Sequence, residues 1–279
     1  MAFYGCDNLE LTSDKLPNYL KSIGYGAFQN CQKISKVGIP SSVVNIGHYA
    51  FSNCSGLKQC VFAEDIQIDN ISSSMFHECK NLEKITIPSS VTTIEGQAFL
   101  GCSKLEKIKI PSSVTTIEGW AFYGCSRLEK ISIPANVTAI GASAFGGCSN
   151  IGEVEFEKES KLTTIESEAF SNCAITSIRI PAGVTKMGYS ALACPDLVDV
   201  TFMGDFGEFE SLFGVYNSRA RTITYYACNS TWTSSAAQKF FSNQNNVTQN
   251  PIHMSEDYTV ITPATCTTDG EKSFTCDKC

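Results

Sequence analysis

The sequence predicts a solenoid of mixed α/β class, in which short units stack side by side and contribute strands to a parallel sheet. One observation is a period of 23 residues, since the segments 82–102, 105–125 and 128–148 nearly repeat one another. The other is that every unit keeps apolar residues at the same positions. Because periods of about 20 to 50 residues are typical of solenoids, the repeat decides the fold class.

Nine of the fourteen cysteines fix the register of the repeat. Each of them follows shortly after an Ala-Phe step or a close substitute of that step. They recur at intervals of 21 to 25 residues: Cys6, Cys31, Cys54, Cys79, Cys102, Cys125, Cys148, Cys173 and Cys194. We therefore expect about nine units, which occupy residues 1–203.

Each unit is predicted to begin with a strand. In residues 105–110, an L-x-x-I-x-I run alternates apolar and polar residues, as a half-buried strand does. Pro111 has no backbone N–H, so we expect it to end the strand and to turn the chain. Side chains such as Lys107 and Lys109 would then point outward from one surface of the stack.

The second half of a unit is predicted to return the chain to the next strand. Val114 and Ile117 begin this return layer, and residues 120–123 are expected to form a single helical or 3₁₀ turn that carries Phe122 inward. Burial of an apolar side chain contributes roughly 1.5–3 kcal/mol, whereas ordering each residue costs about 1–2 kcal/mol of backbone entropy. One unit is therefore unstable alone, and only a stack is expected to fold.

The two ends depart from the repeat. In the first unit, Thr12 and Asp14 stand where strand apolars belong, so we expect a ragged N-terminal edge. The chain also enters the repeat at the step Ala2-Phe3, which favours a segment of a longer protein. Beyond the repeats, we expect an irregular cap at 204–241, with a strand at 221–226 and a helix at 234–241, and then a polar linker and truncated cysteine module at 242–279.

The repeat pattern also resembles a known family. Its signature, L-x-x-I-x-I-P-x-x-V-x-x-I-G-x-x-A-F-x-x-C, is similar to the BspA-type leucine-rich repeats of bacterial and protist surface proteins, over about residues 2–203. The resemblance implies a curved, right-handed horseshoe with the sheet of short strands on its concave side and loops with single helical turns on its convex side. It also implies a cell-surface or secreted protein that adheres to host or extracellular-matrix proteins.

The outward strand positions are the candidate recognition surface, because strands of a horseshoe alternate core and concave-face residues. The tentative binding residues are Lys84, Lys107, Lys109, Lys130, Glu153, Glu155 and Arg179. An alternative is that these residues form solvated cross-strand ion pairs, worth roughly 0.2–1 kcal/mol each, that keep the sheet soluble. No aromatic residue of the kind that dominates binding hot spots interrupts the row.

Composition and motifs exclude several other functions. The net charge of −7 and the pI near 5.1 disfavour nucleic acid as a partner. No apolar run approaches the roughly 18 residues of a transmembrane segment. No catalytic motif is present, so we expect a binding module rather than an enzyme, with extracellular proteins or glycans as partners. The alternatives are a structural spacer and an accessory region of an enzyme whose catalytic domain would lie beyond residue 279.

The repeated cysteines are predicted to be buried thiols without a catalytic role. Equivalent cysteines in neighbouring units would lie about one strand spacing, ~4.8 Å, apart. Their Cα–Cβ bonds would be parallel rather than convergent, which strains a disulfide. A buried cysteine otherwise behaves as a small apolar residue.

The C-terminal residues are similar to a small cysteine module of secreted proteins from Gram-positive gut bacteria. The matching positions are His253, Cys266, Cys276 and Cys279. Three thiolates and one imidazole with C-x-x-C spacing form a set that can hold a structural zinc ion. A disulfide and an incomplete module without metal are the alternatives, and no other cofactor is expected.

Overall fold

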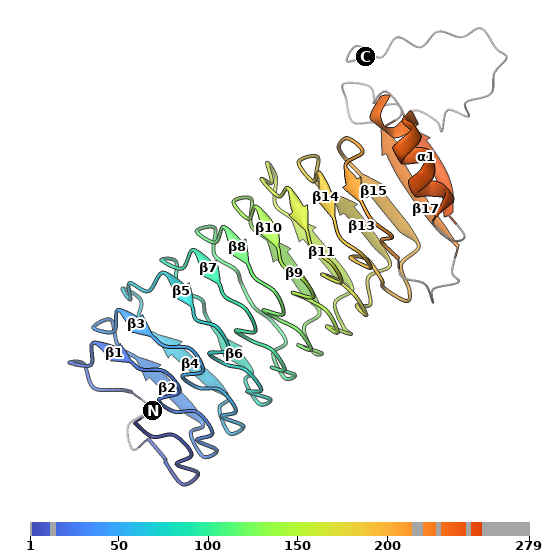
Figure 1. The fold of residues 1–279 in the computed structure, drawn as a ribbon. Helices are drawn as coiled ribbons and strands as arrows, with labels where there is room; N and C mark the ends of the chain where they lie inside the picture. Colours follow the sequence, from blue (N-terminus) through green and yellow to red (C-terminus); the bar gives the residue numbers. More distant parts are fainter. Residues whose placement is uncertain (1, 12–14, 214–219, 227–229, 244–246, 253–279) are drawn as a thin grey trace, which may run out of the picture.

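The computed structural model describes residues 2–11, 15–213, 220–226, 230–243 and 247–252. Figure 1 shows an elongated stack of similar turns that runs from the N-terminal residues at one end to helix α1 (Ser235–Ser242) at the other. All strand pairs between successive turns are parallel. The predicted parallel solenoid of about nine turns is confirmed, while its horseshoe curvature and right-handed sense remain predictions.

The strands fall into two sets, one from each half of the repeat. The L-x-x-I-x-I runs form the first face, with β2 (Lys36–Ile39), β4 (Gln59–Phe62), β6 (Lys84–Ile85), β9 (Lys130–Ile133), β11 (Glu153–Phe156), β13 (Ser177–Ile180), β15 (Asp199–Phe202), β17 (Arg221–Tyr226) and β18 (Val247–Ile252). The return segments form the second face, with β1 (Ser22–Ile23), β3 (Asn45–Ile46), β5 (Asn70–Ile71), β7 (Thr93–Ile94), β8 (Thr116–Ile117), β10 (Ala139–Ile140), β12 (Thr164–Ile165), β14 (Lys186–Met187) and β16 (Glu208–Phe209).

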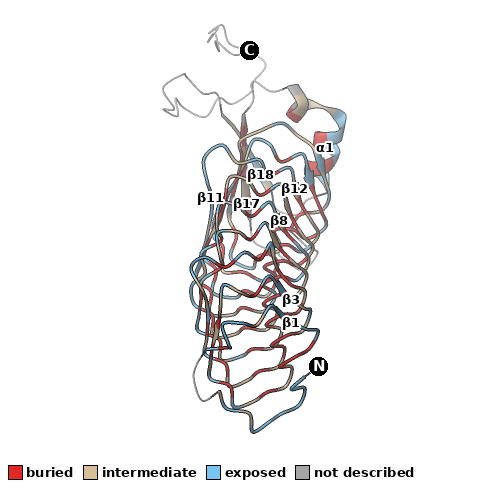
Figure 2. Ribbon diagram, turned by 90° about the vertical axis from the view of Figure 1, so that its left-hand side faces the viewer, coloured by how far each residue is buried: buried red, intermediate tan, exposed pale blue. Residues whose placement is uncertain are grey.

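The longest sheet lies on the second face rather than on the first. Seven strands, from β5 to β16, pair there without interruption. The first face is divided into three sheets, in the orders β2-β4-β6, β9-β11 and β13-β15-β17-β18. Figure 2 shows how the two faces enclose the buried residues of each turn.

The first interruption corrects a prediction, because residues 105–110 form no strand. Leu105 and Ile110 are nevertheless buried, so the core continues through this unit. The ladders place Gln59 opposite Lys84 and Lys130 opposite Glu153, so a strand here would set Lys107 between Lys84 and Lys130. Like charges directly opposite one another destabilise strand pairing, which accounts for the break.

The turns that carry the Ala-Phe steps are not helical, in contrast to the prediction. Around Phe122, the N–H of Tyr123 donates to the carbonyl of Trp120 at 3.1 Å, in a chain of overlapping β-turns. The residue before each step has a φ between 52° and 60°: Gly26, Tyr49, Ser74, Gln97, Trp120, Ser143, Glu168 and Ser190. This left-handed conformation cannot continue a right-handed helix. Among the residues described, helix is confined to η1 (Ser230–Thr233) and α1, and no helix is long and apolar enough to cross a membrane.

Two ladders form the centre of the core. One is a stack of phenylalanine rings with centroids 5.1 to 5.8 Å apart, and it joins Phe3, Phe28, Phe51, Phe76, Phe99, Phe122, Phe145 and Phe170. The other joins each repeated thiol from Cys31 to Cys194 to the phenylalanine carbonyl of the preceding unit, with Sγ to O distances of 2.9 to 3.3 Å. The prediction of buried thiols is confirmed for these eight cysteines, whereas Cys6 is exposed.

The C-terminal end of the stack carries β17 and helix α1. Strand β17 matches the expected 221–226, and Ser234 caps α1 by accepting the N–H of Ala237 at 3.2 Å. Rings from β16, η1 and α1 pack together with Phe206, namely Phe209, Trp232, Phe240 and Phe241. The structure differs from the prediction at Val247–Ile252, which pairs with β17 as β18 where a linker was expected. Because β18 is an edge strand, Pro251 is tolerated in it.

Candidate functional site

The seven residues predicted on the first face are all exposed, and the structure brings three of them together. The ammonium group of Lys130 on β9 lies 2.7 Å from Glu153 Oε1 and 3.2 Å from Glu155 Oε2 on β11. The hydrogen bonds to Glu153 and to Glu155 raise the pKa of Lys130. These three residues therefore form the cross-strand ion pairs that were the alternative to a binding role.

Three other lysines of the first face differ from Lys130. Within the part of the chain that the structure describes, no ion pair joins Lys84, Lys107 or Lys109 to a carboxylate. Glu106, which precedes Lys107, lies 3.4 Å from Nη1 of Arg127 instead. The three lysines thus present uncompensated positive charge where the first-face sheet is interrupted.

Arg179, the remaining residue of the predicted set, lies apart from this group. It belongs to β13, where the strand register places it opposite Thr201. No ion pair joins it to a carboxylate among the described residues. The predicted row therefore divides into a paired cluster around Lys130, an unpaired group at Lys84, Lys107 and Lys109, and Arg179.

The predicted zinc ligands lie outside the described residues: His253, Cys266, Cys276 and Cys279. Within residues 2–11, 15–213, 220–226, 230–243 and 247–252, no group of three histidine, cysteine or acidic residues is arranged to hold a metal ion. The repeated thiols do not resemble reactive cysteines either. Burial raises the pKa of Cys54 to about 12, and burial also raises the pKa of Cys79 and of Cys125. Since the thiolate is the reactive form, these thiols are unreactive at neutral pH.

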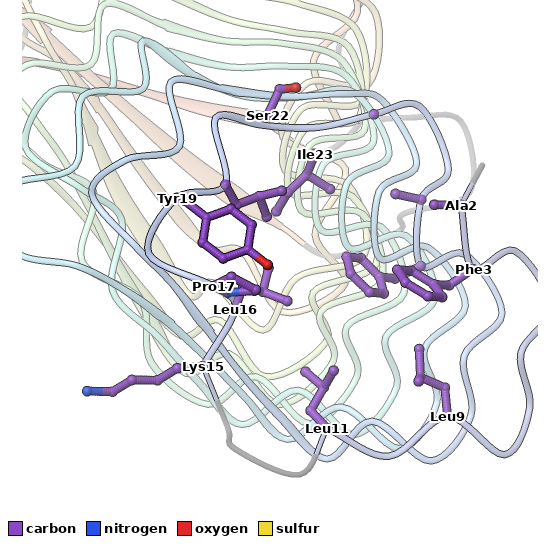
Figure 3. A pocket seen from close by; sticks show the side chains of 14 residues that line it. Ala2, Phe3, Leu9, Leu11, Lys15, Leu16, Pro17, Tyr19, Ser22 and Ile23 are labelled. Atoms are coloured by element: carbon purple, nitrogen blue, oxygen red, sulfur yellow. The ribbon is translucent and has the colours of Figure 1, made fainter.

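A hollow of about 460 Å³ lies at the N-terminal end of the stack (Figure 3). Its lining is almost wholly apolar and includes Phe3, Leu9, Leu11 and Leu16, with Lys15 as its charged residue. A binding pocket normally adds several convergent polar groups to such a lining. Phe3 is 43% exposed here, so the hollow is the uncovered end of the core, in keeping with the expected ragged edge.

Exposed aromatic residues gather on a third side of the molecule, which the sequence analysis did not consider. We define the Ala-Phe edge as the turns at 24–31, 47–54, 72–79, 95–102, 118–125, 141–148, 166–173 and 188–194. Tyr25, Trp120, Tyr123 and Tyr189 are between 41% and 51% exposed there. These residues occupy variable positions beside the Ala-Phe steps, outside the strands where aromatic anchors would have been expected, and their aromatic side chains are the signal in the sequence.

Comparison with known proteins agrees with the architecture. The BspA type Leucine rich repeat region matches in six copies, over residues 1–71, 69–197 and 121–250. No curated protein sequence matches the chain.

Two solved structures are similar. A leucine rich cell surface protein from Faecalibacterium prausnitzii is 29% identical with a TM-score of 0.52, and the match covers 70% of this chain and 50% of that one. A leucine-rich repeat protein from Bacteroides ovatus is 23% identical with a TM-score of 0.57, over 87% of this chain and 69% of that one. The chain therefore spans half the length of the Faecalibacterium protein. The family match covers most of the sequence, and the chain belongs to the family of BspA-type leucine-rich repeats.

Proposed function

We propose that this chain is a non-enzymatic binding module of a cell-surface or secreted protein, and that its first face adheres to host or extracellular-matrix proteins. The observation that carries the proposal is the group of exposed, unpaired lysines at Lys84, Lys107 and Lys109. The similar Faecalibacterium protein is described as a cell surface protein, which supports the location.

The lysine group favours a partner with an acidic surface. The chain as a whole carries a net charge of −7, so a local excess of positive charge orients an approaching acidic partner toward this face. Lys84 lies on β6, and Lys107 and Lys109 lie in a segment that the buried side chains of Leu105 and Ile110 fix to the core. Less conformational entropy is therefore lost on binding than with lysines on a flexible loop.

Reversing the charge of the lysine group is expected to abolish this adhesion. The variant Lys84→Glu/Lys107→Glu/Lys109→Glu should bind at least ten times more weakly to the protein that the unsubstituted chain retains from a panel of purified extracellular-matrix proteins. Biolayer interferometry at about 50 and 300 mM salt measures the affinity, which should fall with salt because screening weakens exposed charges.

Lys186→Glu is the matched control, since Lys186 is an exposed lysine of the second face. It should bind as the unsubstituted chain does. Unchanged binding by the triple variant would refute the first-face proposal.

The alternative function is a spacer that displays another domain away from a surface. The elongated shape in Figure 1 and the uninterrupted seven-stranded sheet favour it. If the unsubstituted chain retains neither a protein of the panel nor an extracellular glycan, the spacer function replaces the adhesion proposal.

We also propose that His253, Cys266, Cys276 and Cys279 hold a structural zinc ion. The support is the chemistry of the donor set, three thiolates and one imidazole with C-x-x-C spacing, which is a common structural zinc set. Metal analysis of the purified protein should find about one zinc ion per chain, and the variant Cys266→Ser should lack it. Intact protein without zinc would refute the site.

A further inference from the structure

Two aromatic side chains stand out on the Ala-Phe edge. Trp120 is 46% exposed and Tyr123 is 41% exposed, whereas the ring of Phe122 between them is fully buried. Both come from one turn, in which the N–H of Tyr123 donates to the carbonyl of Trp120 at 3.1 Å. Tryptophan and tyrosine are enriched in the residues that dominate protein interfaces.

Packing of the repeat does not require these side chains. The left-handed backbone at Trp120 recurs in the other seven turns of the Ala-Phe edge, and the equivalent position is a buried serine in three of them, Ser74, Ser143 and Ser190. The turn geometry therefore explains the φ of 55° at Trp120 but not its indole.

The ring of Tyr123 is held in place by the next unit. A Cβ atom built on Gly146 would lie 3.1 Å from Cδ2 of Tyr123, so the ring lies directly over this glycine. Gly146 thus leaves the space that the ring occupies, while much of the ring remains exposed to solvent. A half-exposed tyrosine that packs closely on a neighbouring unit suits an interface, because a tyrosine has few rotatable bonds and loses little side-chain entropy when a partner covers it.

The Ala-Phe edge also differs in charge from the first face. None of the 21 lysine and arginine residues of the chain lies in its eight turns. Carboxylates do lie there, and two of them reach the units on either side of Trp120. Glu118, from the turn of Trp120 itself, accepts the N–H of Gly96 in the preceding unit at 2.8 Å, and Glu168, two units further along, has its Oε2 3.4 Å from Oγ of Ser143 in the following unit. Anchored carboxylates therefore contact both units that adjoin the unit of Trp120.

We propose that the Ala-Phe edge around Trp120 is a second binding surface, and that its partner is an extended basic segment of a protein. Tryptophan is the best aromatic acceptor for the cation–π contacts of arginine and lysine. The flanking carboxylates pair with further cations of the same segment. The eight turns themselves hold no lysine or arginine, and the lysines that contact their carboxylates, Lys80 on Glu78 and Lys186 on Glu166, belong to other units than that of Trp120. A neutral glycan could stack on the rings and donate hydroxyl hydrogen bonds to the carboxylates, but it carries no positive charge for them to pair with.

The size of the surface predicts weak binding that depends on salt. From the unit of Glu95 to the unit of Glu168 there are three strand spacings of about 4.8 Å each. An extended segment crosses this length with about four or five residues, at roughly 3.3 Å per residue. Interfaces well below the standard size are typical of transient contacts.

The test uses a fluorescently labelled decapeptide that alternates arginine and serine, with anisotropy as the readout. The unsubstituted chain should bind it, and should bind neither the same peptide with glutamine for arginine nor maltohexaose. Trp120→Ser should weaken binding at least tenfold, and serine is the natural residue at the equivalent position of three other units. Glu118→Gln/Glu168→Gln, which keeps the acceptor oxygens, should weaken binding about fivefold and flatten its salt dependence.

Tyr189→Ser is the matched control, because it removes an exposed aromatic from another unit of the same edge. It should bind the peptide as the unsubstituted chain does. Lys84→Glu/Lys107→Glu/Lys109→Glu should bind it no more weakly, which separates this surface from the proposed first-face site. Equal binding by Trp120→Ser, or equal binding of the glutamine peptide or of maltohexaose, would overturn the proposal.

Discussion

Raising the pH from 7.5 to 10 is expected to unfold the protein, because the folded state keeps a ladder of neutral thiols that the unfolded chain would ionise. Burial raises the pKa of Cys54 to about 12. Burial also raises the pKa of the thiols of Cys60, Cys79, Cys102 and Cys125. In Cys173, the pKa is raised first by a side-chain hydrogen bond with Cys194 and then by burial.

The sign follows from the protons that each state binds. The thiol pKa in an unfolded chain is about 8.5. Above that pH the unfolded state releases protons that the folded state retains, so the free energy of unfolding falls as the pH rises. Each buried thiol lowers it by about 1.4 kcal/mol per pH unit. Six thiols together lower it by roughly 8 kcal/mol per pH unit, which is comparable to the whole stability of a typical domain.

Urea denaturation at pH 7.5, 9 and 10, with a reductant present, measures this decline. Cys102→Ser supplies the control, because a serine hydroxyl can still donate to the carbonyl of Phe76 but does not titrate in this range. Its free energy of unfolding should fall less steeply between pH 9 and 10, by about 1.4 kcal/mol per pH unit. An equal free energy of unfolding at pH 7.5 and pH 10 would contradict the prediction.

The core could be predicted from the sequence because a solenoid turns local pattern into tertiary contact. Each unit contacts mainly its neighbours, so a residue that recurs at one period, such as Phe122 or Cys125, must meet its own equivalents. The period alone therefore predicted the inward phenylalanines and the buried thiols. The strand at Arg221–Tyr226 and the helix at Ser235–Ser242 were also predictable, because their apolar patterns are local.

Features that depend on a neighbouring unit were harder to predict. Residues 105–110 have the pattern of a strand, but their pairing depends on the lysines of both adjacent units. A helical turn and a left-handed turn can both carry Phe122 inward. A glycine at position 120 would have indicated the left-handed turn, but the residue there is Trp120. Strand β18 forms by pairing with the edge of β17, and the polar composition of residues 247–252 does not predict that pairing.

In the candidate sites, too, features set by local pattern were predictable and features that depend on a neighbouring unit were not. Alternation along the strands correctly predicted that Lys84, Lys107 and Lys109 are exposed. It could not predict that Glu106 would form its ion pair with Arg127 rather than with one of these lysines. The exposed aromatic residues of the Ala-Phe edge were not predicted as binding residues. They occupy positions that vary between units, and the repeat pattern gives no information about such positions.

Replacement of Phe122 by alanine is expected to cost about 3–5 kcal/mol, the range for a buried phenylalanine. Its ring is fully buried and stacks between Phe99, with centroids 5.1 Å apart, and Phe145, with centroids 5.2 Å apart. The matched control is Phe3→Ala at the end of the stack, where the side chain is 43% exposed and the ring stacks on that of Phe28. That change should cost less, about 1–2 kcal/mol, since little more than half of the side chain is buried.

The position of Phe122 also predicts a change in cooperativity. A solenoid transmits stability only between neighbouring units, so a gap in the middle weakens the coupling of its two halves. In urea, circular dichroism follows the whole chain. Because the chain holds two tryptophans, emission is measured with Trp120→Ser in every variant, so that it comes from Trp232 alone, which is buried in the C-terminal cap and reports that end of the stack. The two transitions should coincide in the unsubstituted protein and in Phe3→Ala but separate in Phe122→Ala.

Phe122→Leu distinguishes apolar burial from ring stacking. Leu192 occupies the equivalent position in the ninth unit and is fully buried, so the turn accepts leucine without rearrangement. The leucine variant should therefore recover most of the stability that alanine loses, with a remaining deficit of about 0.5–1.5 kcal/mol for the lost aromatic pairs. If leucine and alanine were equally destabilising, ring stacking rather than apolar burial would hold the units together. If Phe122→Ala and Phe3→Ala cost the same, the one-dimensional account of the stack would be wrong.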